Sequence, residues 1–457
     1  MKTLVWLLVL LAGFGLMCAS YYGYVRVADP APWFRAFMFV GGEAAGPLPD
    51  GVECLEAALR WMPVPARVRE FTKALGQGSH PFARDVTQGL SEKAVLLPTL
   101  REVFDPDDLA SGRMPESGEA EVLAGAQAKY RHQFPIGDRV FRVVGVLDRS
   151  VVLFADAYLV APDAVGTDVF DPSDADVRRA YVFRDVSPDA VTEAMSDKFK
   201  AAFPKETFVT VVGDLRLGAG PFALYLGGVA LLLLGGSGLF IRLFRWLGSR
   251  VRNRVLGPPL AALGRWWGLL AAVHAVAFGT YVLGSVVGYA VPELQGLLGS
   301  MIVQSIQSGS GPLGMAGEAY GTGSVLIAAA VTLGVNFVVG SVAAITAPSV
   351  VLPGVGVLMT WFRAGILGLV LAPTGLRLAQ VGLPHSFTIL VEMEAYIVAA
   401  FFAMLIPVYL FRQREGPTVL RRWGRALLLN LQSLAVVFIL LAVVALYEAI
   451  EVILQMR

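Results

Sequence analysis

Among the polar side chains within the apolar runs of the C-terminal third of the chain, seven are candidates for a functional role. They are Asn336, Arg363, His385, Glu392, Glu394, Glu448 and Glu451. Ionisable groups inside hydrocarbon are costly unless they are paired or hydrated, so these residues are functional candidates, for a polar pocket or a subunit contact. Arg363 is the basic residue available inside these runs to pair with a carboxylate.

The spacing of these residues leaves alternatives open. His385 and Glu392 are two helical turns or about 10.5 Å apart on one helix face, too far for direct contact. Glu448 and Glu451 share a face at i and i+3. His385, which follows Pro384, is also in a place expected of an interfacial histidine, and the last two glutamates also fit ordinary helix-end carboxylates. If the two C-terminal helices pack together, an acidic cluster forms from His385, Glu392, Glu394, Glu448 and Glu451.

The sequence does not favour enzyme chemistry. A zinc protease of the membrane needs a His-Glu-x-x-His pattern or a similar histidine cluster, but only His274 and His385 lie in apolar segments. The Gly/Ser run at 308–312 lies in a stretch expected to be a loop, and no Gly-Lys-Ser/Thr P-loop occurs. We therefore expect no catalytic residue, metal or cofactor, and any ATP hydrolysis must come from a partner.

Composition places these residues in a membrane chain. Of 457 residues, 56% are hydrophobic and 16% charged, and the mean hydropathy is +0.63, outside the range of ordinary soluble proteins. Residues 28–217 hold 29 of the 36 acidic and 21 of the 37 basic residues. One acidic, water-soluble domain is therefore predicted within an apolar chain.

We predict an α-helical membrane bundle of about seven transmembrane helices. The expected spans are 3–25, 219–241, 263–290, 323–347, 356–373, 386–411 and 427–453. An α+β extracytoplasmic domain, residues 28–217, lies between the first and second helices, after an N-terminal anchor at 1–27. Residues 218–262 form the second helix with a basic segment, and 263–457 form a polytopic domain. The PSVVLPG stretch at 348–354 fits either a tight turn or a re-entrant break.

Basic residues give the orientation. Positively charged residues follow the second and sixth spans. By the positive-inside rule, the two loops that contain them are expected to lie in the cytoplasm. The first group is Arg242, Arg245, Arg250, Arg252 and Arg254. This group is a candidate coupling or lipid-contact element, or equally a simple interfacial anchor. The N-terminus is then cytoplasmic and residues 28–217 are outside. Residues 291–324, which lack Lys and Arg, are expected to form an external loop.

Within the external domain, periodicity predicts both helices and strands. Helices are expected at 51–61 and 119–132, and strands at 139–146 and 151–160. A β-α-β module follows, with strands at 179–184 and 207–212 around a helix at 188–203. Together these elements predict a mixed α+β domain of two small lobes.

The stretch SGRMPESGEAEVLAG, followed by PIGDRVFRVVGVLDRS, resembles the periplasmic core domain of macrolide-exporter-type (MacB-like) ABC permeases. The residues that carry the match are ones suited to turns and strand ends: Gly112, Gly118, Gly125, Gly137, Asp138, Gly145, Asp156 and Pro162. The resemblance covers about residues 1–245. It implies a fold, and a domain placed between a first and a second membrane helix, but no ligand. Those permeases have four helices, fewer than expected here.

From about residue 326 the chain resembles a second family, the stage II sporulation protein M (SpoIIM-like) membrane proteins. The resemblance rests on VNFVVGSVAAIT at 335–346, GVGVLMTWFRAGILG at 354–368, LPHSFTILVEMEAYIVAAF at 383–401 and the closing LYEAIEVIL. The family's histidine-to-glutamate spacing is shorter than the spacing from His385 to Glu392. This resemblance implies an assembly-associated or transport-associated membrane partner and no defined reaction.

The leading hypothesis from the sequence is a permease-like subunit of an ABC-transporter-type complex in a bacterial inner membrane, driven by a separate ATPase. Its expected partners are membrane lipid, that ATPase, other membrane subunits and a periplasmic partner, but not nucleic acid. The alternative is a SpoIIM-like scaffold that recruits envelope proteins without transport. Co-purification of a nucleotide-binding subunit discriminates between the two.

Overall fold

The computed structural model describes residues 2–27, 37–41, 54–61, 93–97, 100–126, 128, 133–136, 139–148, 151–155, 157–165, 169–171, 173–174, 177–183, 209–211, 217–307, 311–352, 354–411 and 418–456. The chain divides into two compact units. A helical unit comprises Met1–Gly23, Leu217–Thr374 and Leu378–Arg457, and a sheet unit comprises Tyr24–Arg216 with Gly375–Arg377.

Six helical segments of the described chain are long and apolar enough to cross a membrane, and they identify a multi-pass membrane protein. The helices are α1 (Lys2–Val27), α6 (Ala219–Arg250), α7 (Gly257–Arg265), α8 (Trp267–Ala290), α9 (Pro292–Gln307), α10 (Gly311–Gly321), α11 (Val325–Gly334), the π-helix η5 (Val335–Thr346), α12 (Ala347–Val351), α13 (Val355–Val370), α14 (Leu376–Phe411) and α15 (Val419–Met456). The segments α11, η5 and α12 run on as one span.

The expectation of seven full spans needs correction at 356–373. This segment is α13, which has 16 residues and is about 24 Å long, shorter than the hydrocarbon core. Its C-terminal carbonyls are capped from α9, because the Gln295 amide donates to the Val370 and Ala372 oxygens at 3.2 and 3.0 Å. At its other end Gly354 has a φ of 106°, and the Val355 N–H donates to the Leu352 carbonyl at 3.1 Å, so a tight turn joins α12 to α13.

The stretch 291–324, expected to be an external loop, contains two helices, α9 and α10. Gly311, in a left-handed conformation, begins α10.

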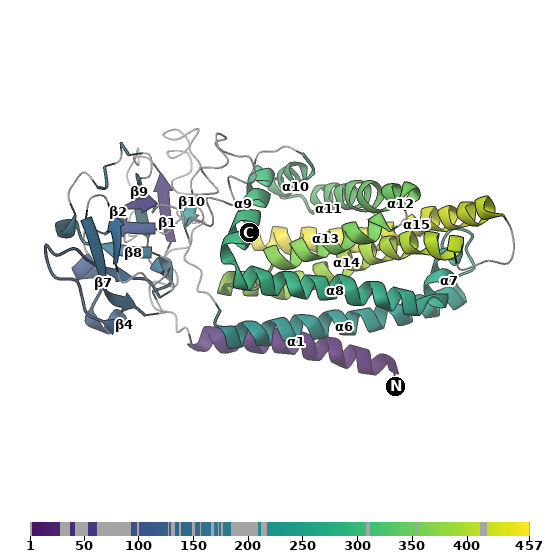
Figure 1. Cartoon of the computed structure of the whole chain (residues 1–457), viewed down its shortest axis with the longest axis horizontal. Coiled ribbons are helices and arrows are strands. Elements are labelled where there is room, and N and C mark those ends of the chain that lie inside the picture. The colour runs from purple at the N-terminus through teal and green to yellow at the C-terminus, as the bar shows by residue number, and fades with distance from the viewer. Residues whose placement is uncertain are drawn as a thin grey trace. The chain divides into compact units, whose positions relative to one another are not determined.

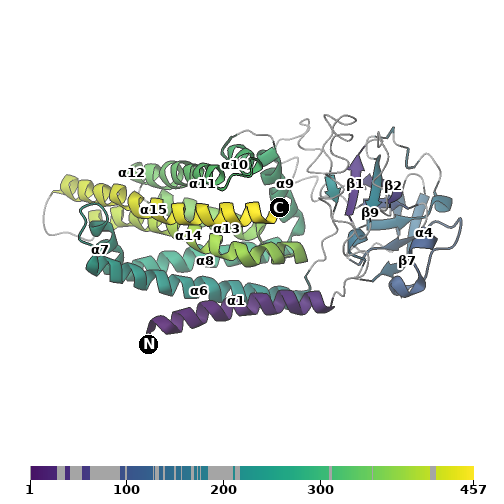
Figure 2. The ribbon, with the colours of Figure 1, turned by 180° about the vertical axis from the view of Figure 1, so that it is seen from behind.

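Small residues allow the helices to approach closely. Figures 1 and 2 show α1 lying along α6, where a Cβ added to Gly228 or Gly235 would collide with the backbone of α1. The same holds between α8 and α13: a Cβ at Gly284 would overlap the Gly365 carbonyl, and one at Gly368 the Tyr281 carbonyl. Close backbone approach of this kind is typical of helix packing in membranes.

The sheet unit is built on one mixed sheet. Its described strands are β1 (Phe37–Gly41), β2 (Cys54–Trp61), β3 (Lys93–Leu96), β4 (Leu109–Gly112), β5 (Glu121–Ala124), β6 (Gln133–Ile136), β7 (Arg139–Leu147), β8 (Ala157–Val160), β9 (Val177–Phe183) and β10 (Val209–Val211). They follow the order β10-β1-β9-β2-β3-β8-β5-β7-β4, with β6 paired to β7. Two apolar clusters, around Phe154 and around Tyr158, form its core.

Several local predictions for this unit are confirmed and others are wrong. The strands expected at 139–146 and 179–184 are β7 and β9, and β10 lies within 207–212. In the described residues, the stretch 51–61 contains the strand β2 and the stretch 119–132 contains the strand β5, where helices were expected. The stretch 151–160 is a short 3-10 turn (Val152–Phe154) followed by β8. The helix expected at 188–203 lies outside the described residues.

Glu121, at the start of β5, is held by hydrogen bonds from its surroundings. The Arg113 guanidinium donates to both Glu121 carboxylate oxygens, at 2.8 and 2.6 Å, and Arg142 donates to Oε1 at 2.6 Å. The Glu116 backbone N–H donates at 3.0 Å. The Arg113 hydrogen bonds above all, with those from Glu116 and Arg142, lower the pKa of Glu121 from 4.5 to about 2.

A Glu121→Gln variant is therefore expected to destabilise the sheet unit by about 2 kcal/mol at neutral pH, because hydrogen bonds to a charged acceptor are lost. The pKa of Glu121 is lower in the folded chain than in the unfolded chain. The difference in unfolding free energy between wild type and variant is therefore complete above about pH 5 and disappears as the pH falls toward 2. Amide hydrogen exchange of β5 and β7, compared between variant and wild type at each pH, measures it. Glu102→Gln, at an exposed position of the Leu100–Val103 helix, is the control. A difference that does not change with pH would contradict the prediction.

Candidate functional site

The central helix of the helical unit is α14. In its most apolar 18-residue window 83% of the residues are buried inside the protein, against 17–50% in the other five candidate spans. Three of its polar side chains, Ser386, Thr388 and Glu394, are buried inside the protein. Three of the seven polar residues singled out by the sequence lie on α14, and the other four lie on η5, α13 and α15.

The first contact joins α14 to α13. Arg363 Nη2 lies 2.9 Å from Glu392 Oε1, and the Tyr396 hydroxyl donates to the same oxygen at 3.0 Å. The guanidinium also stands over the Tyr396 ring, 4.0 Å from its centre, which adds a cation–π attraction. Asn336 Oδ1 of η5 accepts from Arg363 Nη2 at 3.5 Å. Arg363 is thus held by an anion, a ring face and an amide.

The π-helix η5 leaves room for this arrangement. A Cβ added to Gly340 would lie 2.9 Å from both Arg363 Nη1 and the Tyr396 hydroxyl oxygen, so only glycine fits there without displacement. π-Helical geometry is rare and is frequently found at functional sites. The unusual backbone at η5 and the ion pair therefore occur together.

The second contact joins α14 to α15. His385 Nδ1 lies 3.5 Å from Glu451 Oε1, and the Thr388 hydroxyl donates to Glu451 Oε2 at 3.3 Å. The Tyr447 hydroxyl donates to the Pro384 carbonyl at 3.0 Å. These bonds fix the start of α14 against the end of α15.

Glu448 lies between these two contacts. It is hydrogen-bonded to the Tyr320 hydroxyl of α10 and interacts electrostatically with Glu392, His385 and Glu451. Its Oε2 atom is buried without a hydrogen-bond partner. We call the five ionisable residues Arg363, His385, Glu392, Glu448 and Glu451 the polar cluster.

Glu394 is not in the polar cluster. It points to α8, where its Oε2 lies 2.6 Å from His274 Nε2; the two residues are 0% and 2% exposed. His274 Nδ1 lies 2.8 Å from the Leu270 carbonyl, which can only accept, so Nδ1 carries a proton. One further proton lies between Nε2 and the carboxylate. The pair is therefore neutral overall, whichever atom holds that proton.

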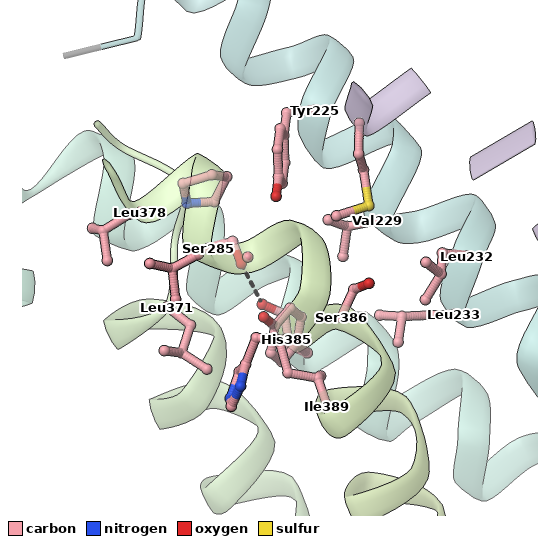
Figure 3. A pocket seen from close by; sticks show the side chains of 15 residues that line it. Tyr225, Val229, Leu232, Leu233, Ser285, Leu371, Leu378, His385, Ser386 and Ile389 are labelled. Atoms are coloured by element: carbon pink, nitrogen blue, oxygen red, sulfur yellow. Dashed lines mark hydrogen bonds between the residues drawn. The ribbon is translucent and has the colours of Figure 1, made fainter. Parts of the chain in front are cut away.

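A small cavity adjoins the polar cluster at His385. Its volume is about 40 Å³, enough for about two or three water molecules. Tyr225 of α6, Ser285 of α8, and His385 and Ser386 of α14 supply polar groups to its wall (Figure 3). The cavity gives water a place next to the His385 ring.

The basic segment lies at one end of the helical unit. Arg242 donates to the Thr3 hydroxyl at 2.8 Å, and the Arg245 guanidinium stands over the Trp267 ring. Arg250 and Arg252 are exposed. The Arg254 carbonyl accepts from the Gln432 amide of α15 at 3.1 Å, so this segment lies near the start of α15.

The structure brings together six of the seven polar residues expected from the sequence, all except Glu394. Sequence reasoning missed the partners that complete the contacts: His274, Tyr320, Thr388 and Tyr396. The i, i+4 spacing of Glu392 and Tyr396 was a usable signal, because such residues share a helix face. No sequence pattern indicated the pairing of His274 with Glu394, because the two residues are 120 positions apart.

Comparison of the chain with protein-family profiles, with curated protein sequences and with solved structures gives no match. Among the described residues, no group of three or more His, Cys, Asp and Glu side chains is arranged to hold a metal ion. Function must therefore be argued from the polar cluster and from the two-unit organisation.

Proposed function

We propose that this chain is a permease-like subunit of an ABC-transporter-type complex, in which a separate ATPase is coupled to an extracytoplasmic domain that handles substrate or a partner. The observation that carries the proposal is the set of ionisable side chains around α14, the most buried helix of an apolar unit. Intramembrane ionisable residues mark substrate and ion pathways, and they are retained despite their cost.

The organisation of the chain also supports this proposal. The sheet unit is inserted between α1 and α6, the placement that the resemblance to macrolide-exporter-type permeases implies. The basic segment 242–254 and the start of α15, with Arg421, Arg422 and Arg425, lie at the same end of the helical unit. By the positive-inside rule that end is cytoplasmic, in a bacterial inner membrane, and residues 28–217 are extracytoplasmic.

The energy source must be a partner, since the sequence has no P-loop. The exposed Arg250 and Arg252 are suited to contact such a partner at the cytoplasmic face.

The test is a pull-down of the tagged chain in mild detergent, followed by mass spectrometry and an ATPase assay. We expect a P-loop ATPase to co-elute at a fixed ratio, and its retention to fall in an Arg250→Ala, Arg252→Ala variant. Arg421→Ala with Arg425→Ala, at the same end of the unit, is the matched control. Recovery of envelope proteins without an ATPase would overturn the proposal in favour of a SpoIIM-like scaffold, and recovery of no partner would also overturn it.

A further inference from the structure

The polar cluster contains more carboxylates than cations. Glu392 is paired with Arg363 at 2.9 Å, and Glu451 with His385 at 3.5 Å. Glu448 has no cationic group within ion-pair distance among the described residues, and its Oε2 has no hydrogen-bond partner. Even with His385 protonated, three ionised carboxylates would leave one uncompensated negative charge in an apolar interior.

Among the described elements that pack on α15, none supplies the missing cation. The elements α11 and η5, which pack on α15, carry no titratable side chain. From α10 come Tyr320, bonded to Glu448, and Glu318, which is exposed. Arg265 of α7 stands over the Trp266 ring. The basic residues of α15 end at Arg425, about 35 Å along the helix from Glu448.

An unpaired carboxylate in such surroundings is neutralised by a ligand of positive charge. The described residues offer no metal-binding group, whereas a proton needs only one oxygen and also gives Oε2 a donor. We propose that Glu448 is a proton-binding site of the membrane unit, carrying one exchangeable proton at neutral pH. This site goes beyond the proposed function, because it does not depend on an ATPase partner.

The cavity at His385 provides a route for exchange. The cavity has room for water beside His385, the His385 Nδ1 faces Glu451, and Glu451 shares a face of α15 with Glu448 at i, i+3. A proton therefore has a chain of titratable groups from the cavity to Glu448.

An apolar carbodiimide tests the proposal in the full chain in lipid nanodiscs. The carboxyl proton passes to a carbodiimide nitrogen as the carboxylate oxygen bonds its central carbon, so only the protonated acid reacts. We expect mass spectrometry to locate the label on Glu448, its loss in alkaline buffer, and its absence in Glu448→Gln. Glu318→Gln, on the exposed face of α10, is the matched control and should leave labelling unchanged.

Infrared spectroscopy supplies a measurement that does not depend on reagent access. The wild-type spectrum should contain one protonated-carboxyl stretch more than the Glu448→Gln spectrum, and that band should be lost in alkaline buffer. Labelling of Glu392 or Glu451 in place of Glu448 would overturn the proposal. So would the absence of both the label and the protonated-carboxyl band.

Discussion

A His274→Leu variant is expected to lose about 3–5 kcal/mol of unfolding free energy, a larger loss than that expected for Glu121→Gln or Arg363→Gln. The change leaves the Glu394 carboxyl group fully buried without the His274 ring nitrogen that lies 2.6 Å from it in the wild type. Unfolding of the purified chain in detergent, titrated with a denaturing detergent, measures the loss.

Because the pair is neutral overall, we expect the opposite result, little loss of stability, when Glu394 is changed to Gln. Glu394→Gln should be nearly neutral, because the Gln amide donates to the unprotonated His274 Nε2 and no charge is removed from the pair as a whole. The double variant His274→Leu, Glu394→Leu should recover most of the stability, since apolar replacements of buried pairs are commonly tolerated. A Glu394→Gln variant as unstable as His274→Leu would show that the pair is not neutral.

The membrane spans were predictable because each one is a local property of the sequence. A run of apolar residues about 30 Å long has no alternative to the bilayer, and six such segments are present in the described chain. The exception was α13, whose end depends on a cap from Gln295, some 75 residues earlier in the chain. Local hydropathy carries no information about such a contact.

The errors in the sheet unit have a different cause. The sequence of β2, CLEAALRW, is rich in good helix formers. It is a strand because β9 pairs with one of its edges and β3 with the other, and the environment of a sheet overrides intrinsic preference.

The polar cluster was only partly visible in the sequence. Arg363 could be identified because few basic residues lie inside the apolar runs. Helix periodicity placed Glu448 and Glu451 on one face of a helix. Which carboxylate meets Arg363 depends on how α13 rotates against α14. Glycines set that rotation through close backbone contacts with α8 and η5, and such contacts have no signature in periodicity.

An Arg363→Gln variant is expected to lose about 2–3 kcal/mol of unfolding free energy. The change removes the cation from Glu392 and the cation–π contact with Tyr396. This expected loss of stability is at the lower end of the range for buried ion pairs, because the Arg363 side chain is 33% exposed. Arg250→Gln, at the exposed end of α6, is the control and should change stability by less than about 0.5 kcal/mol.

Reversal of the pair separates charge from packing. Glu392→Arg alone places two guanidinium groups within reach of each other, and Arg363→Glu alone places two carboxylates there, so each single variant should be at least as unstable as Arg363→Gln. The double variant restores one anion and one cation on the same two helices and should recover at least half of the summed loss, a positive coupling in a double-mutant cycle. If the two losses simply add, the ion pair contributes nothing beyond the volume of its side chains, and α13 is held to α14 by apolar contacts and by Tyr396 alone.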